Sequence, residues 1–106
     1  MQFDMQNMLN QVKKLQQEMG KKQAEVKNRV ITADSGGGMV VVTMTGAARL
    51  TDVKIDKALI ENKDIQMLED LIVAAVNKAK DTVDKMLEDA VGGIASMLPN
   101  LPGMNL

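Results

Sequence analysis

Apolar residues recur every three or four positions in the first quarter of the chain, and this spacing predicts a long amphipathic helix. The apolar stripe consists of Met5, Met8, Val12, Leu15, Met19 and Val26. Asp4 is suited to cap the helix, because its carboxylate can accept a hydrogen bond from an unpaired backbone N–H. We predict a helix from Asp4 to about Lys27. Because the stripe is narrow, we expect this helix to project and to contact a partner over only part of its length.

The next part of the chain has the composition of β-strands. Segments rich in β-branched residues and separated by turn residues predict an antiparallel three-stranded meander; they are residues 28–34, 39–45 and 46–56. Alternation in the middle strand places Val40, Val42 and Met44 on one face and Met39, Val41, Thr43 and Thr45 on the other. Both faces then carry apolar groups. We expect helices of the same chain to cover one face, and the sheet of a second copy to cover the other.

A second helical stripe follows a turn-rich bridge at residues 57–64. Its members are Ile65, Leu68, Ile72, Ala75, Ala79, Val83, Met86 and Ala90. Asp64 is suited to cap this helix, and Gly92 and Gly93 are expected to end it. Residues 95–106 contain two prolines and a glycine, so we expect a flexible tail whose Met and Leu residues can dock on a partner subunit. Residues 1–106 therefore predict a single α+β domain with a long N-terminal helix, a three-stranded antiparallel sheet and a long C-terminal helix.

The glycine cluster at residues 36–38 raises the question of a phosphate-binding loop. Such a loop opens a helix, whereas these glycines precede the strand-like run MVVV. Glycine adopts the positive φ angles of tight turns, and Asp34 and Ser35 are common turn residues. We therefore interpret the cluster as a hairpin turn.

The residue types that the chain lacks argue against catalysis. Its 106 residues include no His, Cys, Trp or Tyr. His is the side chain that titrates nearest neutral pH, and Cys would supply a thiolate nucleophile or metal ligand. The acidic residues of the second long helix are interpreted as a solvated face, because a hard-cation site needs oxygen ligands that converge in a loop. We expect no enzyme activity, no cofactor, no bound metal and no small-molecule substrate.

The chain also lacks the features of a membrane or exported protein. No apolar run approaches the roughly 20 residues of a membrane-spanning helix. The N-terminal sequence MQFDMQNMLN does not have the basic and then apolar plan of a signal peptide. We expect a cytoplasmic protein that does not bind membranes.

The ordered set of segments resembles the YbaB/EbfC family of bacterial nucleoid-associated proteins. The resemblance rests on the Ser-Gly-X-Gly turn, Gly46, Val53-x-Ile55-Asp56 and Met67-Leu68-Glu69-Asp70-Leu71, within a match that spans most of the chain. It implies a homodimer that forms through the sheet region, with helical arms that protrude like tweezers. It further implies binding to double-stranded DNA on the nucleoid, with an influence on nucleoid organisation and transcription.

Charge is unevenly distributed along this nearly neutral chain. Residues 1–30 hold six basic and three acidic side chains, whereas residues 64–89 hold three lysines and seven acidic side chains. Because cations that meet phosphates dominate DNA affinity, the resemblance assigns DNA contact to the first arm. Its candidate residues are Lys13, Lys14, Lys21, Lys22, Lys27 and Arg29. Asn10 and Gln17 lie on the same helix side as Lys14 and Lys21, and are candidates for contact with sugar and phosphate.

A second hypothesis is a protein-interaction or scaffolding module for which DNA binding is incidental. Its Met-rich stripe and apolar tail would hold another protein. An apolar contact persists as salt rises, whereas a lysine–phosphate contact weakens. Taken alone, the lysines fit a solvated helix surface better than a binding site, and the family resemblance is what favours DNA.

Overall fold

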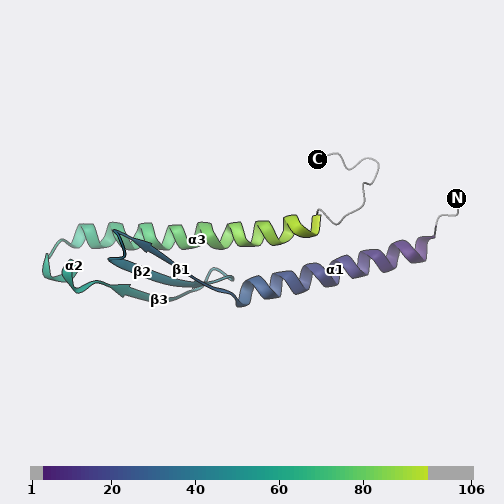
Figure 1. Ribbon diagram of the computed structural model, residues 1–106, viewed down its shortest axis with the longest axis horizontal. Coiled ribbons are helices and arrows are strands. Elements are labelled where there is room, and N and C mark those ends of the chain that lie inside the picture. The colour runs from purple at the N-terminus through teal and green to yellow at the C-terminus, as the bar shows by residue number, and fades with distance from the viewer. Residues whose placement is uncertain (1–3, 96–106) are drawn as a thin grey trace.

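The computed structural model describes residues 4–95, and its elements follow the predicted order. They are α1 (Met5–Asn28), β1 (Val30–Ser35), β2 (Val40–Thr45), β3 (Leu50–Ile55), α2 (Lys57–Glu61) and α3 (Ile65–Ala95). The molecule is elongated, with extents of 75 × 25 × 15 Å. Figure 1 shows α1 and α3 extending from the sheet region in the same direction. The predicted α+β architecture is confirmed, while the expected tail beyond Ala95 lies outside the described residues.

Both long helices begin at the predicted caps. Asp4 Oδ1 accepts a hydrogen bond from the backbone N–H of Asn7 at 3.3 Å, and Asp64 Oδ1 accepts one from Met67 at 3.0 Å. The expected end of the second long helix is wrong, because α3 continues through both glycines to Ala95. A glycine inside a helix costs only about 1 kcal/mol relative to alanine, which a long packed helix tolerates. The bridge at residues 57–64 also contains a helix that was not predicted, α2.

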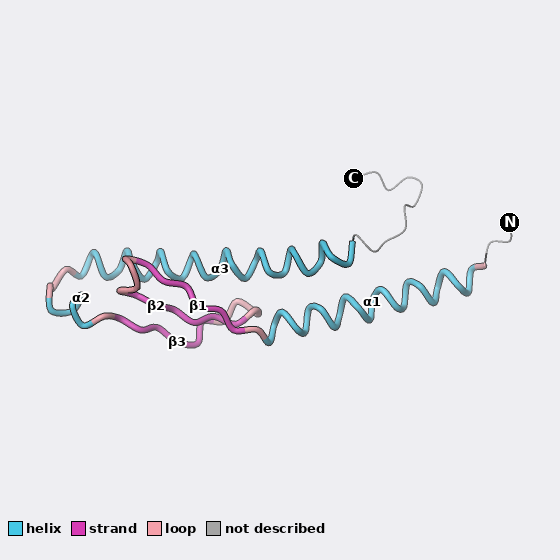
Figure 2. The backbone as a smooth tube through the Cα atoms, in the orientation of Figure 1, coloured by secondary structure: helices cyan, strands magenta, loops and turns pink. Residues whose placement is uncertain are grey.

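The three strands form an antiparallel sheet in the order β1-β2-β3 (Figure 2). Gly36, Gly37 and Gly38 have φ angles of 60°, 67° and 93°, so the interpretation of the glycine cluster as a hairpin turn is confirmed. Ser35 has a further role, because its Oγ donates a 2.6 Å hydrogen bond to the carbonyl oxygen of Leu71 in α3. The hairpin is thereby tied to the helix that covers it.

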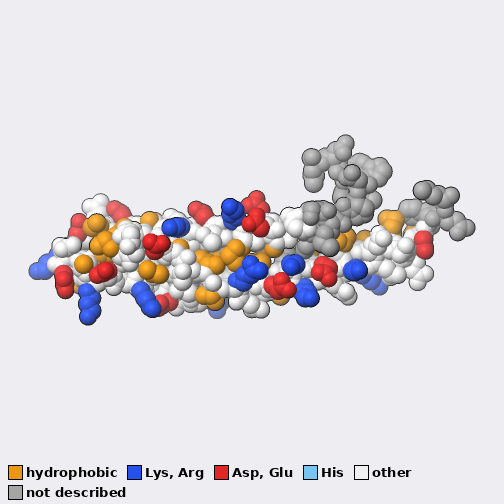
Figure 3. All heavy atoms as spheres, viewed as in Figure 1, with side chains coloured by type: hydrophobic (Ala, Val, Ile, Leu, Met, Phe, Trp, Pro, Cys, Tyr) orange, Lys and Arg blue, Asp and Glu red, His pale blue; other side chains and the backbone are white. Residues whose placement is uncertain are grey.

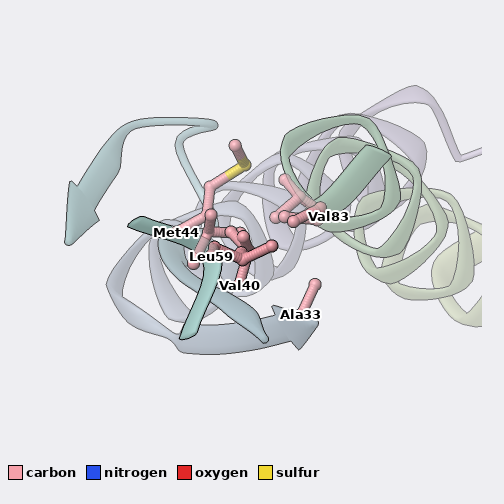
Figure 4. Packing of buried hydrophobic residues seen from close by; sticks show 8 residues of the cluster. Ala33, Val40, Met44, Leu59 and Val83 are labelled. Carbon is pink, nitrogen blue, oxygen red and sulfur yellow. The ribbon is translucent and has the colours of Figure 1, made fainter. Parts of the chain in front are cut away.

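The hydrophobic core lies between α3 and the first two strands (Figure 4). Its buried members are Ala33, Val40, Val42, Met44, Leu59, Ala75, Ala79 and Val83. The alanines of α3 have short side chains, so the helix backbone can lie close to the strands. The predicted alternation in β2 is confirmed, since the three residues on the core side are buried and Val41, Thr43 and Thr45 are half-buried.

The sheet face away from α3 is more polar than the alternation in β2 alone suggested. The strand register pairs Thr43 with Asp52 and Val41 with Lys54, and Thr32 of β1 lies on the same face. Because charged and hydroxyl side chains interrupt the apolar ones, this face tolerates water. The packing of the chain therefore does not require a second sheet there.

Candidate nucleic-acid interface

Helix α1 carries the predicted DNA-contacting residues and stands largely clear of the rest of the molecule. Val26 is its one buried residue. The C-terminal half of α1 packs beside α3, and its N-terminal half continues past the end of α3 (Figure 1). Abundant Gln, Lys and Glu favour a helix even where few contacts support it. The prediction of a projecting helix with one partner over part of its length is confirmed.

Close backbone packing fixes the direction in which α1 leaves the sheet. The Gly46 N–H donates a 2.9 Å hydrogen bond to the carbonyl oxygen of Arg29. A Cβ atom at position 46 would lie 1.6 Å from the carbonyl oxygen of Val26. No other residue fits this approach without moving the helix, so Gly46 is a positioning residue for the arm.

Three of the six predicted cations lie on the outer face of α1. At 100° per residue, Lys13, Lys14 and Lys21 fall on the side opposite the apolar stripe, together with Asn10 and Gln17. All five are exposed. Within residues 4–95, none of the ion pairs involves these three lysines. Their charges are therefore available to an anionic ligand.

Lys22 and Arg29 occupy a different environment. They line a cleft of about 450 Å³ between α1 and α3, together with Glu18, Glu25 and Asp89. Lys22 Nζ lies 3.7 Å from Glu25 Oε2. Because three carboxylates share the cleft with two cations, its electrostatic potential does not favour a phosphate.

Lys27 is the sixth candidate, and it is exposed in the last turn of α1. A cation there also interacts favourably with the negative end of the helix dipole. Lys27 therefore extends the basic face of α1 toward the sheet without belonging to the cleft.

Helix α3 lies beside α1 with the opposite balance of charge. Its acidic residues are exposed, as interpreted from the sequence. Two of its three lysines are paired, Lys78 with Asp34 at 3.7 Å and Lys80 with Asp84. In the described part of the chain, no three acidic side chains converge in a group able to hold a metal ion. Figure 3 shows basic side chains along α1 interspersed with acidic ones, so the visible side of the arm has mixed charge.

Comparisons with known proteins identify the family. The model of the YbaB/EbfC DNA-binding family matches residues 1–98. The chain belongs to the YbaB/EbfC DNA-binding family. A nucleoid-associated protein from Bartonella bacilliformis is 38% identical over 103 residues, which cover 97% of this YbaB/EbfC chain and 95% of that protein. A second nucleoid-associated protein, from Syntrophobacter fumaroxidans, is 40% identical over 100 residues, which cover 94% of this chain and 90% of that protein.

A solved structure has the same fold as this YbaB/EbfC chain. The crystal structure of an uncharacterized protein from Helicobacter pylori matches with a TM-score of 0.74 at 23% identity, and covers 89% of this chain and 99% of that one. The resemblance inferred from the ordered motifs is therefore confirmed. No helix within residues 4–95 is long and apolar enough to cross a membrane.

Sequence reasoning missed the division of the six cations between two environments. One signal was available, because Lys22 falls where the three–four spacing of the stripe calls for an apolar residue. A cation at that position lies toward the partner helix, although half of the Lys22 side chain remains exposed to solvent. For Arg29, which follows the end of α1, no periodic signal existed.

Proposed function

We propose that this YbaB/EbfC protein is a homodimeric nucleoid-associated protein that binds double-stranded DNA through the outer face of α1. The observation that carries the proposal is a projecting arm with three exposed lysines that have no carboxylate partner within residues 4–95. Lysines that neutralise phosphates release condensed counterions, which drives binding to any duplex sequence. With Phe3 as the one aromatic residue, stacking on single-stranded bases contributes little.

Within this proposal the six cations have unequal roles. Lys13, Lys14 and Lys21 contact phosphates, and Lys27 extends that surface. Lys22 and Arg29 instead lie in the cleft between α1 and α3, where they interact mainly with its acidic residues. Bound in many copies, the protein coats the cytoplasmic nucleoid and influences its organisation and transcription.

The homodimer is proposed from an apolar strip that the chain leaves uncovered. Register places Leu50, Val53 and Ile55 of β3 on the same sheet face as the core residues of β2. The packing of α3 is on β1 and β2, so these side chains remain 42%, 36% and 37% exposed. Exposed apolar side chains that adjoin a core mark a surface for association.

Two apolar side chains of α3 also lie outside the core, on a side of the helix that also carries Lys80. Val73 and Leu87 are exposed on the side of α3 opposite Lys78, whose ammonium group reaches β1. In the proposed dimer a twofold axis lets each copy cover the apolar strip of the other, and it doubles the number of basic arms.

A substitution of the three outer lysines by glutamine tests the DNA proposal. We expect K13Q/K14Q/K21Q to weaken binding to a mixed-sequence duplex by about tenfold or more. The slope of log K against log salt concentration should become less negative by about 0.9 for each phosphate contact that is lost. The measurement is fluorescence anisotropy of a labelled duplex at several salt concentrations.

The matched control changes the same number of charges at the other end of the molecule. Lys54, Lys57 and Lys63 are exposed around α2, away from the arms. K54Q/K57Q/K63Q should retain most of the affinity. If the two triple variants lose affinity equally, the outer face of α1 is not the DNA site; if the first binds like the parent, the assignment is wrong.

A further inference from the structure

The projecting half of α1 carries an apolar seam that the described part of the chain does not cover. Met5, Met8 and Val12 are 67%, 43% and 47% exposed, and Leu15 is half-buried. Their spacing alternates strictly between three and four residues. This is the pattern of a two-stranded coiled coil, which is narrower than the stripe of a helix that packs on a core. The seam is therefore typical of a helix that pairs with another helix.

Helix α3 supplies a second helix over only part of α1. Residues 86–93 of α3 line the cleft with residues 18–29 of α1, and the N-terminal half of α1 continues past the described end of α3 (Figure 1). A helix from another molecule can take up the seam where α3 leaves it. A long helix must do so antiparallel to α1, because one that ran parallel would reach α3 within one or two turns.

The same segment of a second copy satisfies these conditions. In an antiparallel pair related by a twofold axis, Met5 of each copy packs on Leu15 of the other, and Met8 packs on Val12, so that every layer of the contact is apolar. Beyond the overlap, the two copies of α1 continue in opposite directions, each beside its own α3.

The flanks of the seam also suit a pair of identical helices. Within residues 5–16 the flanking positions hold Leu9, Gln11 and Gln16, none of which is charged. Two copies therefore meet without like-charge repulsion there, and Leu9, which is 57% exposed, gains apolar contact. The outer lysines lie about 130° around the helix from the middle of the seam, so the pairing leaves them in solvent.

We propose that the projecting halves of α1 from two copies pair as a short antiparallel coiled coil. The contact is about 15 Å long, which is small for an interface that must bury roughly 1,200–2,000 Å² to be stable. It therefore forms at high local concentration and adds to the proposed dimer without replacing it. The inference depends on neither the apolar strip of β3 nor the proposed DNA binding. Together with that binding, the contact links copies that are held on DNA.

Disulfide trapping tests the pairing, because the chain has no Cys. When the Met8→Cys and Val12→Cys proteins are mixed at high concentration in a thiol redox buffer, the heterodisulfide should exceed each homodisulfide by about fivefold. Mass spectrometry measures the three products. In the control, Asn10→Cys replaces Met8→Cys and should give no such excess, since position 10 is directed away from the seam. A dominant Val12 homodisulfide would indicate parallel helices and overturn the proposal, as would the absence of covalent dimers.

Sedimentation velocity gives an independent readout without engineered thiols. Met8→Gln with Val12→Gln keeps the charge and a good helix former. This variant should lose the rise in weight-average mass that the parent shows above micromolar concentration. The control Ile60→Gln with Ile65→Gln changes side chains that are 59% and 68% exposed at the other end of the molecule, and it should associate like the parent. If the seam variant also associates like the parent, or the parent shows no rise, the seam does not pair.

Discussion

At the scale of single residues, the glycines of this chain have different physical tasks. Gly36, Gly37 and Gly38 supply positive φ angles in a hairpin turn, and there is open space around the last two. Gly46 has no such backbone requirement, but the carbonyl oxygen of Val26 occupies the place of its Cβ. The first role concerns backbone conformation, and the second sets the position of an entire helix.

Alanine substitutions distinguish these two tasks. We expect Gly46→Ala to destabilise the protein by about 3 kcal/mol, because either the strand or α1 must move to relieve a backbone clash. Gly37→Ala should cost about 1 kcal/mol, since only a left-handed backbone angle is strained. Urea unfolding followed by circular dichroism measures both. Equal losses would mean that the junction between α1 and the sheet yields easily.

At the scale of elements, α1 has two faces with separate partners. Its outer face carries lysines that form no ion pair with the described residues, and the other side carries an apolar stripe that meets α3 over its C-terminal half. The cleft between the helices mixes Lys22 and Arg29 with acidic residues of both. If α1 binds DNA as proposed, the acidic α3 beside it repels the same duplex, and the affinity then reflects the difference between the two helices.

Neutralising one acidic residue of the cleft should therefore strengthen DNA binding. We expect Asp89→Asn to raise duplex affinity by about two- to fivefold at low salt, and by less as salt screens the charge. Asp70→Asn removes the same charge about 28 Å away along α3, far beyond the roughly 10 Å Debye length at 0.1 M salt. The control should bind like the parent in a titration at matched ionic strength. An equal gain from both variants would indicate a net-charge effect that does not involve the cleft.

At the scale of the whole molecule, the distribution of apolar surface decides how copies would associate. The sheet is wider than its own helix covers, so β3 is uncovered on the core side while the opposite face carries threonine and charged residues. An isolated copy leaves this surface in water, and a paired copy buries it. The proposed dimer is thus a completion of the core rather than a stacking of two sheets.

A charge placed on the uncovered strip should separate the copies. We expect Val53→Asp to shift the mass in sedimentation equilibrium from twice 11.5 kDa to that of a single chain, because burying an unpaired carboxylate in an apolar interface is costly. Thr32→Asp, on the opposite sheet face, should leave the dimer intact, and circular dichroism should confirm that both variants are folded. If the Thr32 variant dissociates and the Val53 variant does not, the copies meet through the face that the sequence pattern first suggested.

Much of the architecture could be predicted because it depends on near neighbours in the chain. Residues close together in the sequence determine the helix periodicity and the caps at Asp4 and Asp64. They also determine the alternation in β2 and the hairpin formed by the glycines. The basic character of α1 and the acidic character of α3 follow from composition alone. The family could be inferred because the motifs occur in order over most of the chain.

Other features arise only when distant segments meet. The contact of Gly46 with Val26, the hydrogen bond of Ser35 to Leu71, and the position of Lys22 and Arg29 beside Asp89 join residues far apart in sequence. The same holds for the apolar strip of β3, since its exposure depends on how far α3 extends across the sheet. Periodicity reports which residues share a face, but the packing of whole elements determines which faces remain in water, and therefore which lysines are free to meet an anionic ligand.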